Sequence, residues 1–135
     1  MTPRSKRLSL TLGTILSAFT VLLYADSALH CPRGNPVTAD LGEGVIMRTC
    51  IWQNESQQAV RVGPLELIKN GILILKTQTN LDGKLHGRFT SWSDDGVMIK
   101  DGLYHLGLKQ GNWLEPDENG NPVQREYDAG KLLPN

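Results

Sequence analysis

The stretch HGRFTSWSDDGVMIKDGLYHLGLK (86–109) decides the fold, because a similar stretch stands on either side of it. VGPLELIKNGILILKTQTNLDGK (62–84) precedes it, and QGNWLEPDENGNPVQREYDAGK (110–131) follows it. Glycines recur in phase in the three copies: leading Gly63, Gly87 and Gly111, central Gly71, Gly96 and Gly120, and closing Gly83, Gly107 and Gly130. The interval between successive leading glycines is the same in both cases. A fixed period of this kind is typical of repeat proteins.

Each copy has the pattern of a β-hairpin. Asn70-Gly71, Asp95-Gly96 and Asn119-Gly120 are dipeptides that turn one strand back on another, because both residues tolerate a positive φ. A hairpin of this size cannot bury its own apolar face, so it must stack against its neighbours. The sequence therefore predicts an all-β fold, an elongated antiparallel sheet of six or seven short strands. Its three stacked hairpin repeats span about 63–86, 87–110 and 111–135 within residues 61–135.

Residues 1–27 have the layout of a secretory signal peptide. Arg4, Lys6 and Arg7 precede an uncharged apolar stretch, Leu8 to Ala25, and small residues follow it. Ala25 and Ser27 favour cleavage after Ser27. The alternative is an uncleaved membrane anchor, for which the apolar stretch is short. We expect export to the periplasm, the cell envelope or the exterior of a Gram-negative bacterium, with no stable membrane insertion after cleavage.

The charge balance excludes some classes of partner. The chain has 14 basic and 14 acidic residues, and residues 1–27 hold three of the former and one of the latter, so the remainder carries 11 minus 13, or −2. Nucleic-acid binding requires a clustered basic face, and none is evident.

Two cysteines, Cys31 and Cys50, remain after the leader. An even number of cysteines in an exported small domain favours a disulfide. The rival use of Cys31 is lipidation, but His30 stands directly before it, where lipoprotein signals have a small residue. We therefore expect residues 28–60 to form an irregular cap, tied by Cys31–Cys50, that leads into a strand ending near Trp52.

Five aromatic residues have the character of a binding set: Phe89, Trp92, Tyr104, Trp113 and Tyr127. Packing of repeat on repeat is one use for them, because the repeats need apolar contact. The other is a groove for a peptide, a glycan or an envelope partner. Trp113 shares its position in the repeat with Leu65 and Phe89, which predicts a core position, whereas Trp92 aligns with Ile68 and Pro116.

The phrases HGRFTSWSDDG, KQGNWLEPDENG and DGLYHLGLKQG resemble the bacterial variant of the MORN repeat. The chain is similar to exported proteins grouped as YwqK-type antitoxins, some of which share a CPxG opening and a second cysteine before the first repeat. The resemblance covers roughly residues 31–135. It implies a β-hairpin repeat fold and protein–protein association.

No catalytic, nucleotide or metal-binding motif is evident in the sequence. His30, His86 and His105 are not at metal-ligand spacing, and we expect no metal or other cofactor. The sequence therefore predicts a non-enzymatic, exported module that binds a protein or another component of the cell envelope. The alternatives are a purely structural envelope protein and an antitoxin or immunity protein that binds a toxin.

Overall fold

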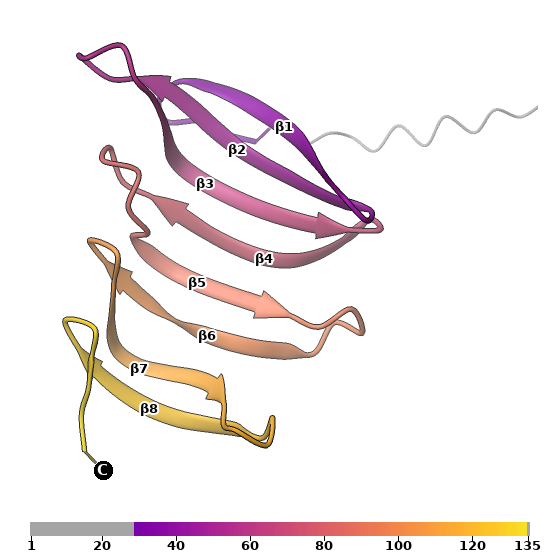
Figure 1. The fold of residues 1–135 in the computed structure, drawn as a ribbon, viewed down its shortest axis with the longest axis vertical. Helices are drawn as coiled ribbons and strands as arrows, with labels where there is room; N and C mark the ends of the chain where they lie inside the picture. Colours follow the sequence, from indigo (N-terminus) through magenta and orange to yellow (C-terminus); the bar gives the residue numbers. More distant parts are fainter. Residues whose placement is uncertain (1–28, 135) are drawn as a thin grey trace, which may run out of the picture.

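The computed structural model describes residues 29–134, which form one open antiparallel sheet (Figure 1). The spatial order of the strands follows the chain from β1 to β9. The strands are β1 (Asn35–Gly42), β2 (Val45–Gln53), β3 (Ala59–Lys69), β4 (Ile72–Thr79), β5 (Gly87–Trp92), β6 (Met98–His105), β7 (Leu108–Pro116), β8 (Pro122–Asp128) and β9 (Lys131–Leu132). The predicted all-β class and antiparallel sheet are confirmed. The described sheet has nine strands, however, where six or seven were expected.

One additional strand, β1, lies in the N-terminal segment, where an irregular cap was expected. Asn35–Gly42 is extended and pairs with β2 through a two-residue turn at Glu43-Gly44, both with positive φ. The Gly, Pro and Asp residues of this segment indicated a loop, but the chain bends only at residues 32–34 and turns at Glu43-Gly44, on either side of the strand. The other additional strand is β9, a two-residue pairing after Ala129-Gly130.

The turns of the sheet are of two kinds. Two-residue turns with positive φ at both positions join β3 to β4 at Asn70-Gly71 and β6 to β7 at Leu106-Gly107. Longer turns close with an N–H···O bond between residues four apart, as from Ser93 to Val97 (2.8 Å) and from Asp117 to Asn121 (2.8 Å). Asp95 and Asn119 lie in these longer turns and do not have positive φ, although Gly96 and Gly120 do. The dipeptides thus mark the turns, but only Asn70-Gly71 has the predicted geometry.

The same irregularity interrupts the ladder at Gly63, Gly87 and Gly111, which all have positive φ. Between two neighbouring pairings, the strand that carries the glycine advances by two more residues than its partner. The pairs on either side are Thr49↔Leu65 and Ile51↔Arg61 at Gly63, Lys76↔Thr90 and Thr79↔Leu85 at Gly87, and Asp101↔Leu114 and Leu103↔Gln110 at Gly111. Such bulges bend a strand and increase its twist, which explains the strong coiling of the sheet in Figure 1.

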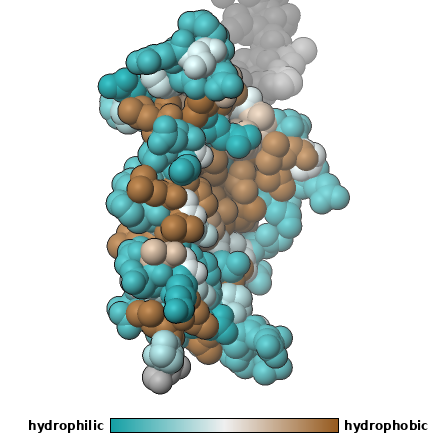
Figure 2. Space-filling model, turned by 60° about the vertical axis from the view of Figure 1, so that its left-hand side comes forward, coloured by the Kyte–Doolittle hydropathy of each residue, from teal (hydrophilic) through white to brown (hydrophobic). Residues whose placement is uncertain are grey.

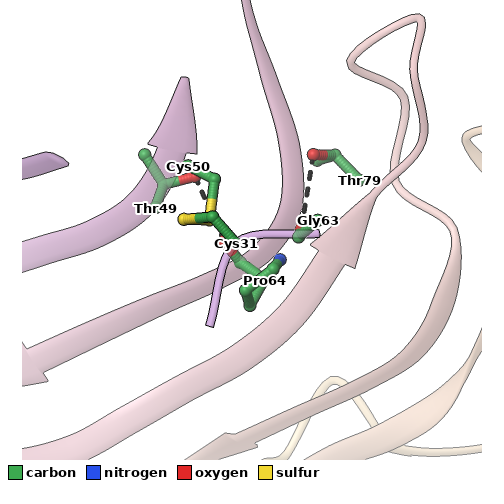
Figure 3. Close-up of a disulfide and its surroundings, with 6 residues drawn as sticks. All are labelled: Cys31, Thr49, Cys50, Gly63, Pro64 and Thr79. Atoms are coloured by element: carbon green, nitrogen blue, oxygen red, sulfur yellow. Dashed lines mark hydrogen bonds between the residues drawn. A yellow bond between two sulfur atoms is a disulfide. The ribbon is translucent and has the colours of Figure 1, made fainter. Parts of the chain in front are cut away.

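The predicted disulfide between Cys31 and Cys50 is confirmed (Figure 3). It joins the segment before β1 to β2, and Cys50 is fully buried. The same segment packs on β3, because a Cβ added at Gly63 would lie 3.2 Å from Cδ of Pro32. The first residues of the described chain are therefore fixed to the first three strands. The predicted leader, residues 1–27, lies outside the described residues.

The sheet is a single layer, since each strand packs chiefly against its neighbours in the sheet. Few side chains are buried as a result: among the described residues, the buried apolar ones are Cys50, Val62 and Trp113. Register assigns the side chains to two faces, because residues directly opposite each other share a face. We call the side with Leu65, Phe89 and Trp113 the aromatic face, and the side with Glu66, Lys76 and Asp101 the charged face.

Candidate interaction surface

Three of the five aromatic residues that the sequence suggested as a binding set form one cluster on the aromatic face. The ring centroid of Trp113 lies 5.8 Å from that of Phe89 and 4.9 Å from that of Tyr104, with the tyrosine edge-on. Phe89 and Tyr104 are 5.6 Å apart, also edge-to-face. The Trp113 indole N–H donates to the Leu103 carbonyl oxygen at 3.0 Å, and the residue is only 1% exposed. These rings therefore pack strands β5, β6 and β7 together.

Gly102 makes room for this cluster, a role that the sequence pattern did not reveal. It lies on β6 opposite Phe89, and a Cβ placed there would come within 2.2 Å of the Trp113 ring. Its φ is not positive, so space alone requires a glycine here. The Trp113 indole thus lies directly against the backbone of β6.

We expect Gly102→Ala to destabilise the protein by about 1–3 kcal/mol, because the new methyl group must displace a packed indole. Denaturant unfolding of the variant measures this cost. The cost should shrink in a Trp113→Leu background, where the clash is relieved. An equal cost in both backgrounds would contradict the contact.

A polar network continues the cluster on β7 and β8. Glu115 is 5% exposed and accepts hydrogen bonds from Lys109, from the Tyr127 hydroxyl and, at 3.0 Å, from Arg125. The Lys109 ammonium also lies 4.8 Å from the centroid of the Trp113 ring and 4.6 Å from that of Tyr127. Lys109 and Glu115 belong to the same strand, and the bulge at Gly111 lies between them.

The network fixes the charge of Glu115. Burial alone would raise the pKa of this carboxyl group, but the hydrogen bonds from Lys109, Tyr127 and Arg125 outweigh burial and lower the pKa to about 2. Burial would lower the pKa of Lys109, and its hydrogen bond to Glu115 raises it instead. Both groups are therefore charged near neutral pH, and each compensates the buried charge of the other.

Trp92 and Tyr127 differ in their placement. Tyr127 shares the aromatic face with Trp113 and is committed to the network. Trp92 pairs with Met98 beyond a register shift and lies on the charged face, with no ring stacked on it in the described chain. The five predicted residues thus do not form one groove. Four lie on one side of the sheet, three of them in ring contact, and the fifth lies on the other.

An aliphatic patch extends the aromatic face toward the N-terminus. Met47, Leu67 and Leu75 lie directly opposite one another across β2, β3 and β4, and Leu65 lies beside them on the same face. All four are partly exposed, because no second layer of the described chain packs over them. Hydrophobic side chains gather at the height of β3 to β5 in Figure 2. The alternation Leu65-Glu66-Leu67 is the sequence signal that could have identified this patch.

Ion pairs link neighbouring strands across the charged face. Glu66 lies 3.9 Å from Arg48 and 4.0 Å from Lys76, so the three charges alternate across β2, β3 and β4. On β5 and β6, Arg88 makes a two-bond contact with Asp101 at 2.9 and 2.7 Å. Ion pairs that water can still reach stabilise a fold only weakly, but these pairs make this face polar.

His86 and His105 lie close together with ring centroids 5.1 Å apart, a proximity that the sequence spacing did not indicate. His86 Nδ1 accepts the Leu106 N–H, and no group of three or more potential metal ligands occurs in the described residues. A shallow pocket of about 250 Å³ between β4 and β5 is lined by residues that include Thr77 and Arg88, and two larger, more open hollows of about 650 and 470 Å³ border Trp52.

No helix in residues 29–134 is long and apolar enough to cross a membrane. Comparison of the chain with known protein families, with curated proteins and with solved structures found no match. Function must therefore be inferred from the residues themselves.

Proposed function

We propose that this chain is an exported, non-enzymatic module of MORN-like repeats that binds a protein of the cell envelope through its aliphatic patch. The observation that carries the proposal is the unequal use of the aromatic face. Its C-terminal half is filled by the Trp113 cluster and the Glu115 network, whereas Met47, Leu65, Leu67 and Leu75 stay partly exposed. Contiguous apolar surface of this kind is typical of sites that bind other proteins.

Three bulges support the repeat interpretation. They occur at the equally spaced leading glycines, and each adds two residues to the same side of the ladder. A repeat that places the same irregularity at the same position is consistent with copies of one structural unit. The resemblance to the MORN variant implies the same fold and an association with other proteins.

The disulfide supports export. Cys31–Cys50 is consistent with an oxidising compartment, where such bonds persist. The basic, apolar and small-residue order of residues 1–27 fits the same destination.

The substitution Leu75→Lys tests the proposed site, because it places a charge at one end of the Met47–Leu67–Leu75 row. Leu103→Lys is the matched control, since Leu103 is 51% exposed on the charged face. Immobilised protein and both variants are incubated with the envelope fraction of the source cells. We expect the unmodified protein and Leu103→Lys to retain the same partner and Leu75→Lys to lose it. Undiminished capture by a folded Leu75→Lys variant would refute the site, and no specific capture by any of them would favour a structural role.

A further inference from the structure

The two edges of the open sheet differ. β1 is an eight-residue strand at one edge, and seven of its residues are exposed. At the other edge, β9 covers the end of β8, and the Leu133 N–H donates to the Glu126 carbonyl oxygen at 2.8 Å. That bond shows that the even-numbered residues of β8 direct their backbone N–H and C=O groups away from β7. Pro122 has no N–H, so Gln124 offers the one donor in the uncovered part of β8.

The backbone orientation of β1 follows from Pro36. Opposite residues in an antiparallel pair alternate between pairs that exchange two hydrogen bonds and pairs that exchange none. Pro36 lies opposite Cys50 and has no N–H, so their pair is of the second kind. Thr38 and Asp40 share its orientation and direct their N–H and C=O groups away from β2. β1 therefore has two backbone N–H donors, those of Thr38 and Asp40, that point away from β2.

A hydrogen bond on the far side of β2 gives the same alternation. The Asn70 N–H donates to the Gly44 carbonyl oxygen at 2.9 Å, so even-numbered residues of β2 bond to β3. The odd-numbered residues of β2 then bond to β1, and their partners are Asn35, Val37 and Ala39. Beyond Asp40 the register shifts, so that Gly42 pairs with the odd-numbered Val45 of β2, and the Gly42 N–H is bonded to the Asp40 carboxylate at 2.8 Å. Within the part of the chain that the structure describes, the free pairing capacity of β1 is thus confined to Pro36–Asp40.

We propose that β1 pairs antiparallel with β1 of a second copy of this chain, about a two-fold axis at Thr38. In this register the two Thr38 residues exchange both of their hydrogen bonds. The Asp40 N–H of each copy meets the C=O of Pro36 in the other, so the missing proline N–H leaves no donor unmatched. Asp40 faces Pro36 and not another Asp40, which keeps the two carboxylates apart.

The side chains agree with this register. Val37 lies on the aromatic face, in the row of Thr49 and Leu65, and it would lie opposite Ala39 of the second copy on the same face. The two-fold axis runs through the sheet, so both aromatic faces lie on one side and the two aliphatic patches become neighbours. Pairing of β1 with β8 of another copy would use one donor of β8, and it would add further copies without end. Pairing of β1 with β1 about a two-fold axis instead stops at a dimer. The dimer does not depend on the proposed envelope partner.

Analytical ultracentrifugation of the purified protein over a range of concentrations tests the pairing. We expect a reversible dimer, and Thr38→Pro should raise its dissociation constant at least about tenfold, because it removes a donor at the two-fold axis. The Thr38 N–H does not bond to β2, so the fold and the disulfide should persist. Gln124→Pro removes the outward donor of the opposite edge and should leave the dimer unchanged. A monomer at all concentrations, or a dimer indifferent to Thr38→Pro, would overturn the proposal.

Cysteine cross-linking tests the register. Residues in a hydrogen-bonded pair have Cα atoms about 5.5 Å apart, which a disulfide can span, so Thr38→Cys should give a covalent dimer on oxidation. The two Asp40 residues would be about 14 Å apart, so Asp40→Cys should remain uncross-linked. Cross-linking at position 40 in preference to position 38 would overturn the proposed register.

Discussion

Replacing Trp113 by alanine is expected to cost about 3–5 kcal/mol of folding free energy. The indole is 1% exposed, contacts Phe89 and Tyr104, and covers the backbone at Gly102. Its removal leaves a cavity among three strands of a sheet that has few other buried side chains. A loss of this size is a large fraction of the stability of a small domain. Urea-induced unfolding followed by tryptophan fluorescence and circular dichroism measures it.

Trp92→Ala is the matched control for this prediction. Trp92 is partly exposed on the charged face and lacks stacked rings among the described residues, so its removal should cost less than half as much. A larger loss for Trp92→Ala than for Trp113→Ala would mean that the core of the sheet lies on the other face.

Acid is expected to weaken the fold by about 3 kcal/mol through Glu115 alone, at about 1.4 kcal/mol for each unit by which its pKa is shifted. The folded pKa of about 2 is below the ordinary value of 4.5, so this group stabilises the fold at pH values above about 5. The contribution is lost as the pH falls from about 5 to about 2, because the carboxyl group must take up a proton and release Lys109 and Arg125. Unfolding free energies measured across this range give the profile.

Glu115→Gln should lower the stability at neutral pH and remove most of this acid dependence. A smaller dependence should remain, because the N–H groups of Asn121 and Asn119 lower the pKa of Asp117. Glu118→Gln removes an exposed charge from the same hairpin and should leave the profile unchanged. An unaltered acid profile in Glu115→Gln would show that the network does not stabilise the fold through this carboxylate.

Much of the sheet could be predicted from the sequence, because turns and strands are local features. Asn70-Gly71 and Gly96 mark turns through backbone preference, and alternation marks the strands between them. β1 was missed because Gly, Pro and Asp are common in loops, and only its pairing with β2 makes Asn35–Gly42 a strand. Pairing is a property of two segments, and neither segment shows it alone.

The candidate site was harder to predict. Trp113 could be assigned to a core position, since large apolar residues recur there in all copies. The contact of Lys109 with Glu115 depends on the bulge at Gly111, which changes the distance between two side chains on the same strand. Gly102 has no positive φ and no turn pattern, so nothing local distinguishes it. Its role appears only when β7 lies beside β6.

Oxidative labelling of methionine tests the central claim most directly, that the aliphatic patch is covered by a partner in the cell envelope. Met47 belongs to the patch, and Met98, 42% exposed opposite Trp92, is an internal control on the charged face. The protein is labelled in the envelope fraction and after purification, and both methionines are quantified by mass spectrometry. We predict that Met47 is protected in the envelope and oxidised in the purified protein, while Met98 reacts equally in both. Equal oxidation of Met47 in the two samples would contradict the account.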